Sequence, residues 1–166
     1  MTPEEPTIVE RTATSYAAIS VNVTMDRIGE VVPPLNGEVF AWLAAHGGAP
    51  NGPPFWKYNV IDMARGLEIE AGVTVAQPVA GDGRVITGTL PAGRYVTVRH
   101  VGHPSTLMAA TASLLDWAAQ RQLTWDVSPS PDGERWGARL EFYLTDPSVE
   151  PDMNQWVTEL AFRLAP

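Results

Sequence analysis

The stretch that decides the fold is Arg139-Leu140-Glu141-Phe142-Tyr143-Leu144-Thr145-Asp146-Pro147. Every second residue from Leu140 to Leu144 is apolar, so these side chains share one face of a β-strand and can pack into a core. Arg139, Glu141 and Tyr143 must then point the other way. A carboxylate beside an aromatic ring is typical of a pocket for a flat, cationic or hydrogen-bonding small molecule.

The composition limits the function classes. With 166 residues, of which 45% are hydrophobic and 18% charged, the chain is expected to form a single globular domain, residues 1–166. The net charge of −8 repels phosphate backbones and anionic membranes, so we expect no direct nucleic-acid binding and no membrane partner. The absence of cysteine excludes disulfides and thiolate catalysis and fits a cytoplasmic location. The acidic start, residues 1–6, is unlike a secretory signal.

The spacing of apolar residues predicts the same order of elements twice. The helix in the first half follows Pro33-Pro34, with Asn36 as a possible cap, and Gly47-Gly48 ends it. The expected elements are a strand over 15–24, this helix, a loop over 49–54, strands over 55–61 and 67–75, a turn at 82–83, a strand over 93–101, a helix from 104 or 105 to 122, and strands over 136–144 and 155–164. We infer a duplication with halves at about 12–78 and 84–164, preceded by an N-terminal segment, 1–11.

The predicted fold class is α+β, a duplicated strand-helix-strand-strand unit. Because each helix covers only one face of its sheet, the two antiparallel sheets can join, with the helices on one side and a ligand cleft on the other. A register slip of one residue would invert the contribution of a strand. Strand parity directs the following side chains into this cleft: Tyr16, Ser20, Trp56, Tyr58, Glu68, Glu70, Tyr95, Thr97, Glu141, Tyr143 and Glu159.

Several motifs, in order, carry a likeness to a known family. They are Gly52 to Tyr58, Leu67 to Val75, Leu90 to Tyr95, His100-Val101-Gly102, Leu140 to Pro147 and Trp156 to Glu159. Over roughly 12–164 the chain resembles the GyrI-like (gyrase-inhibitor-like) small-molecule-binding domain, which is also the effector-binding domain of many AraC-type and MerR-type bacterial regulators. The resemblance implies a ligand cleft between two tandem halves, lipophilic and often cationic ligands, and a glutamate at the pocket floor, a position that Glu141 occupies.

Two features depart from that family. Gly102-His103-Pro104 stands where the family commonly has Gly-Pro-Tyr, so an aromatic residue near the second helix is missing. No helix-turn-helix or basic region precedes the domain, so we expect a stand-alone member that does not read DNA by that route.

The candidate ligand contacts are the acids and aromatic residues on the predicted cleft strands. Glutamates on strands are mostly solvated, and the family position is what favours Glu141 as a contact. Glu70 could equally anchor internal hydrogen bonds. No metal-ligand spacing among the three histidines and no nucleotide-binding motif occurs, so we expect no metal and no cofactor. The candidates are Glu141, Tyr143, Tyr58, Trp56, Tyr95, Tyr16, Trp136 and Glu70.

Three functions stay open. The favoured one is a binding protein that captures hydrophobic, aromatic or cationic compounds, for effector sensing or xenobiotic sequestration, with Glu141 supplying the charge. The second, implied by stand-alone members of the family, is a hydrolase of cyclopropanoid-type xenobiotics, in which Glu141 would orient or deprotonate a water and Tyr143 or a tryptophan would hold the substrate. The third is a protein-protein inhibitor of a DNA enzyme or the partner of a regulatory protein, which the thinly spread acidic charge supports only modestly.

Overall fold

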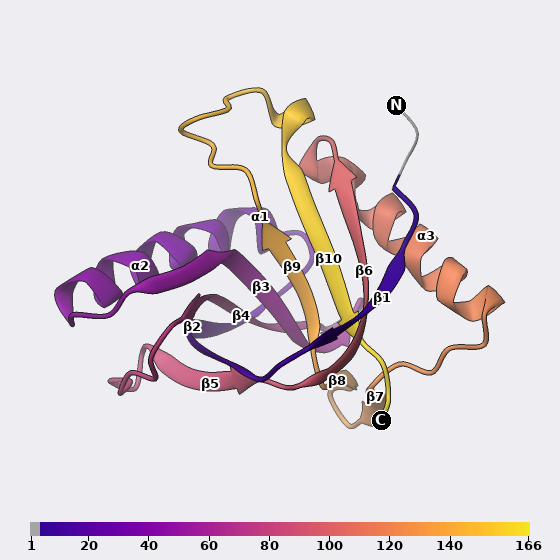
Figure 1. Cartoon of the computed structure of the whole chain (residues 1–166), viewed down its shortest axis with the longest axis horizontal. Helices are drawn as coiled ribbons and strands as arrows, with labels where there is room; N and C mark the ends of the chain where they lie inside the picture. Colours follow the sequence, from indigo (N-terminus) through magenta and orange to yellow (C-terminus); the bar gives the residue numbers. More distant parts are fainter. Residues whose placement is uncertain (1–3) are drawn as a thin grey trace.

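In the computed structural model, which describes residues 4–166, ten strands form one antiparallel sheet that curls into a half-barrel and carries two long helices (Figure 1). Residues 1–3 of the expected N-terminal segment lie outside the described residues. The strands are β1 (Thr7–Arg11), β2 (Thr14–Val23), β3 (Pro50–Asp62), β4 (Gly66–Val75), β5 (Ile86–Leu90), β6 (Gly93–Val101), β7 (Val127–Ser130), β8 (Gly133–Trp136), β9 (Arg139–Tyr143) and β10 (Val157–Arg163). The helices are α1 (Ile28–Val31), α2 (Pro33–Ala45) and α3 (Leu107–Gln120), with short 3-10 turns η1 (Pro104–Thr106) and η2 (Met153–Gln155).

The duplicated unit predicted from the sequence is confirmed. The first half runs β2-α2-β3-β4 and the second runs β6-α3-β9-β10, with the β7–β8 hairpin inserted before β9. The strand order along the sheet is β1-β6-β10-β9-β3-β4-β2-β5, so the two halves join where β9 pairs with β3. The α+β fold class is thereby confirmed.

The boundaries of several elements differ from the sequence-based expectation. The segment 49–54, expected as a loop, contains the start of β3, which tolerates its prolines because the pairing with β4 is irregular between Pro50 and Pro54. The single strand expected over 136–144 is broken at Gly137, which has no room for a Cβ atom because the Asp126 carboxylate lies against it. Strands β1 and β5 were not expected. They are short strands that extend the sheet at its two ends by pairing with β6 and β2.

Both long helices pack on the same face of the sheet. Val39 and Leu43 of α2 are fully buried against Ile19 and other apolar side chains of the first half. Leu114 of α3 is buried against Leu160 and its neighbours in the second half. Burial of each such side chain stabilises the fold by about 1.5–3 kcal/mol. In Figure 1, the strands β3, β9 and β10 run between the two helices.

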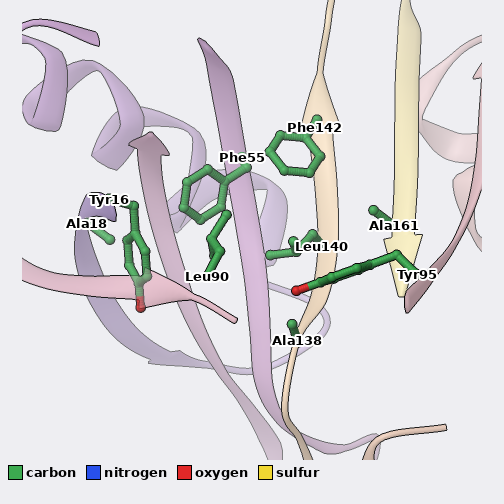
Figure 2. Packing of buried hydrophobic residues seen from close by; sticks show 9 residues of the cluster. All are labelled: Tyr16, Ala18, Phe55, Leu90, Tyr95, Ala138, Leu140, Phe142 and Ala161. Atoms are coloured by element: carbon green, nitrogen blue, oxygen red, sulfur yellow. The ribbon is translucent and has the colours of Figure 1, made fainter. Parts of the chain in front are cut away.

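The opposite face of the sheet is filled by a second apolar core (Figure 2). Alternation along the strands shows this directly, because Ala17 packs under α2 whereas Tyr16 and Ala18 belong to the other core. Phe55 lies at its centre, with its ring 5.5 Å from that of Tyr16 in an edge-to-face contact and 5.7 Å from that of Phe142. The cluster consists of Tyr16, Ala18, Phe55, Leu90, Tyr95, Ala138, Leu140, Phe142 and Ala161. The helix-free face is therefore packed by the protein's own side chains.

Candidate ligand-binding site

The site is built around Glu141, in the middle of β9. Glu141 pairs with Trp56 of β3 on one side and with Leu160 of β10 on the other. Directly paired side chains point to the same face of a sheet, and Leu160 packs under α3, so Glu141 lies on the face that carries the helices. Its side chain is only 8% exposed, so its charge must be balanced by nearby groups or by a ligand.

Two tyrosines donate hydrogen bonds to the same oxygen of this carboxylate. The hydroxyl of Tyr143 lies 2.6 Å from Glu141 Oε1, and that of Tyr58 lies 2.9 Å from the same atom. Among residues 4–166, no side chain or backbone group donates to the second oxygen, Oε2. The ring of Trp56 stands edge-on to that of Tyr143, with 5.2 Å between the centroids. The result is a half-satisfied carboxylate beside three partly exposed aromatic side chains.

Asn36 of α2 fixes the position of Trp56. Its side-chain amide nitrogen donates to the backbone oxygens of Phe55 and Gly72 at 3.2 Å each, and its Oδ1 accepts from Trp56 Nε1 at 2.7 Å. The expectation that Asn36 caps the helix was wrong, because α2 begins at Pro33 and the first turn has no side-chain cap. Asn36 falls instead on the buried stripe of the helix, at i, i+3 and i+7 with Val39 and Leu43, and this spacing could have revealed its role.

Arg139 lies on the same face as Glu141, two residues earlier in β9. Its guanidinium carbon lies 4.8 Å from the centroid of the Trp136 ring and 4.7 Å from that of Phe162, two rings of the second half. It makes no side-chain hydrogen bond and no ion pair with any residue in 4–166. Burial lowers the pKa of Arg139, although an arginine stays charged at any physiological pH. Alternation along the strand predicted the direction of the Arg139 side chain but not its place beside the site.

The electrostatics of the site follow from burial. Burial raises the pKa of Glu141 above its ordinary value of 4.5, while the hydrogen bonds from Tyr143 and Tyr58 and the charge of Arg139 act in the opposite direction. Burial and the neighbouring Glu141 charge also raise the pKa of both tyrosines well above 10.0, so both stay protonated and act as donors. The arrangement can accept a cation or a hydrogen-bond donor, and a carboxylate with a raised pKa can also act as a base.

Tyr16 and Glu70 lie together on the opposite face of the sheet. The Tyr16 hydroxyl donates to Glu70 Oε1 at 2.6 Å, and Oε2 accepts from Asn59 at 2.6 Å and from the Lys57 ammonium at 3.3 Å. Tyr95 belongs to the same helix-free core and donates to the backbone oxygen of Pro91 at 2.6 Å. These groups are paired internally.

The expectation that all the parity-assigned side chains share one face was wrong. Trp56 pairs with Ala71, and Lys57 pairs with Glu70, so Trp56 and Tyr58 point away from Glu70. The relative parity of β3 and β4 depends on their pairing register, and a shift of one residue exchanges the two faces. Of the predicted contacts, the structure brings together Glu141, Tyr143, Tyr58 and Trp56.

Trp136 lies apart from these residues, in the core beneath α3. It is buried, with its ring 5.9 Å from that of Trp125, and its indole nitrogen has no hydrogen-bond partner within residues 4–166. It reaches the site only through Arg139, which covers its ring.

Other features of the described chain lie outside this site. A cavity of about 310 Å³ opens near the β3–β4 turn and β8, with Arg65, Glu68 and Arg135 in its lining. Residues 4–166 contain no group of three or more histidines or acids that could hold a metal ion. Nor does any helix in this range have the length and apolar character needed to cross a membrane.

Comparison with solved structures finds several proteins that share this fold. The chain is similar to the EcmrR C-terminal domain, with 18% identity, 98% of each chain covered and a TM-score of 0.75. The chain also matches EcmrR in a structure of its DNA complex, with 19% identity and a TM-score of 0.76. That match covers 99% of the present chain but only 58% of the longer EcmrR chain. The present chain is also similar to SAV2435 bound to tetraphenylphosphonium, with 10% identity, 97% and 94% coverage and a TM-score of 0.61.

Sequence comparison gives the family. No curated protein matches the chain. The family model of the GyrI-like small molecule binding domain, however, matches residues 4–165, which is nearly the whole sequence. The resemblance noted from the motifs is confirmed, and the chain belongs to the GyrI-like small-molecule-binding domain family.

Proposed function

We propose that this protein captures aromatic, lipophilic cations at the face of Glu141, as an effector sensor or a sequestering agent for xenobiotics in the cytoplasm. The observation that carries the proposal is the buried Glu141 carboxylate, which accepts from Tyr58 and Tyr143 through Oε1 only and lies on the same face of the sheet as Trp56. The family is one of small-molecule binders, and one structural neighbour holds tetraphenylphosphonium, a ligand of this chemical class.

The physical basis is charge complementarity within an aromatic frame. A cation against an aromatic face gains about 0.5–2 kcal/mol, depending on how far it is desolvated. The carboxylate adds a charge that has already lost most of its hydration, so a cation can pair with it at a small further cost. Stacking tolerates many ring systems, so we expect the site to accept a range of aromatic cations.

The test is a titration of the protein with tetraphenylphosphonium, followed by tryptophan fluorescence, for the wild type and for Glu141→Gln. Loss of a charged partner in a partly desolvated site corresponds to about 1–3 kcal/mol, so the variant should bind about 5- to 150-fold more weakly. The matched control is Glu159→Gln, which removes the same charge from a glutamate on the opposite face that pairs with Arg11 at 2.7 Å. Equal affinity of the wild type and Glu141→Gln would refute the role of Glu141.

A hydrolase of cyclopropanoid-type compounds is the second candidate. The raised pKa of Glu141 supports it, since a general base works best when its pKa lies near the operating pH. Tyr143, hydrogen-bonded to the same oxygen, would hold the substrate. Incubation with such a compound and mass spectrometry of the products separates turnover from binding, because a binding protein returns the compound unchanged.

A further inference from the structure

We propose that Arg139 is a second ligand contact in this site, and that the preferred ligands are aromatic zwitterions, which carry a carboxylate or similar anionic group as well as a cationic group. The inference rests on the proposed function, since it adds a contact to the same site. It concerns the chemical class of ligand that the site selects.

The geometry of Arg139 leaves its donors free. Its guanidinium carbon lies 4.8 and 4.7 Å from the centroids of the Trp136 and Phe162 rings, which are themselves 5.8 Å apart, so both rings lie toward one side of the group. A guanidinium carries five N–H donors, and contact with aromatic rings supplies none of them with an oxygen acceptor such as a carboxylate. No residue in 4–166 accepts a hydrogen bond from this side chain, which is itself partly buried.

Arg139 and Glu141 do not satisfy one another. No nitrogen of Arg139 lies within ion-pair distance, 4.0 Å, of a Glu141 oxygen in the described chain, and Oε1 of Glu141 is taken by the two tyrosines. As residues i and i+2 of one strand face, their backbones are about 7 Å apart. An unpaired cation and a half-satisfied carboxylate therefore lie side by side. The anionic group of a zwitterionic ligand can pair with Arg139, and its cationic group can pair with Glu141.

The site differs in this respect from the other buried acid of the sheet. Glu70 lies beside a cation, Lys57, and the two are joined at 3.3 Å, with the remaining acceptors taken by Asn59 and Tyr16. The charges of Glu70 and Lys57 therefore pair with one another, and the carboxylate needs no partner from a ligand. Glu141 and Arg139 are not paired with one another, so each can take a partner of opposite charge from a ligand.

The test uses two dyes that differ in one group. Rhodamine B carries a carboxylate and a delocalised cation, and its ethyl ester carries the cation alone. Fluorescence anisotropy titrations give the Kd of each dye for the wild type, Arg139→Gln, Arg139→Lys and Glu141→Gln. We expect Arg139→Gln to weaken rhodamine B binding at least tenfold and to leave ester binding unchanged or a few-fold tighter. Arg139→Lys keeps the charge without the planar fork and should give an intermediate ratio of the two Kd values.

Arg135→Gln is the control, since it removes an exposed arginine that lines the separate cavity and should leave the ratio at the wild-type value. A ratio that Arg139→Gln does not change, or no binding of rhodamine B to the wild type, would overturn the inference. If the inference fails in this way but Glu141→Gln still weakens binding of the ester, the proposed function stands without the Arg139 contact. If the ratio depends on Arg139 while Glu141→Gln leaves the ester unaffected, the Arg139 contact stands and the role of Glu141 falls.

Discussion

Replacing Tyr143 with phenylalanine removes a single hydroxyl from the centre of the site. That hydroxyl donates to Glu141 Oε1 at 2.6 Å, and the edge-on contact of the ring with Trp56 is kept in the variant. A hydrogen bond to a charged group contributes about 1.5–3 kcal/mol to stability. Because Tyr143 is partly exposed, water can replace part of the lost bond, and we expect a loss of about 1.5–2 kcal/mol in the free energy of unfolding at pH 8.

The loss should shrink in acid. The folded-state pKa of Glu141 is raised above its unfolded value of 4.5, so the stability that this group contributes is present below pH 4.5 and is lost as the pH rises through the folded pKa. The Tyr143 hydrogen bond favours the ionised form, so its removal raises the folded pKa further and increases the loss at high pH. At pH 4 the acid is mostly protonated in both states, and the bond that is missing is chiefly a neutral one of about 0.5–1.5 kcal/mol.

Urea unfolding followed by circular dichroism, at pH 8 and pH 4, measures both values. Tyr95→Phe is the control, since it deletes a hydrogen bond of the same length, 2.6 Å, to the uncharged Pro91 carbonyl and should cost the same at both pH values. An equal loss for Tyr143→Phe at pH 8 and pH 4, or no loss at either, would refute the reasoning that this tyrosine stabilises an ionised, buried carboxylate.

Two further predictions concern the same site. The affinity for tetraphenylphosphonium, a permanent cation, should fall by up to tenfold per pH unit once the pH drops below the raised pKa of Glu141. Binding titrations at several pH values should show this fall in the wild type and a flat profile in Glu141→Gln. Asn36→Ala should lower the free energy of unfolding by about 1–3 kcal/mol, because two backbone carbonyls and the indole N–H of Trp56 lose their hydrogen-bond partner. The fluorescence of Trp56 should change as well. An unchanged emission spectrum would contradict the anchoring role of Asn36.

Much of the site was predictable from local pattern. Alternation over Arg139 to Tyr143 sets Glu141 and Tyr143 on one face, and the structure confirms this with a hydrogen bond between them. The two helices and the duplicated order of elements also follow from apolar spacing. Asn36 was assigned a different role, because a polar residue near a helix start is usually a cap. Arg139 was not expected as a contact, because nothing local indicates which rings lie beside it.

The sequence by itself determined which side chains of a strand stand together, because a strand has a repeat of two residues that needs no partner. It also determined that each half has one helix to cover its sheet. Only the tertiary structure decided which face of β9 meets Trp56 and Tyr58 of β3, and that the face carrying the helices, and not the helix-free one, bears the half-satisfied carboxylate. The reason is that the pairing of strands from different halves is set by long-range hydrogen bonding and packing, and a shift of a single residue would exchange core and site.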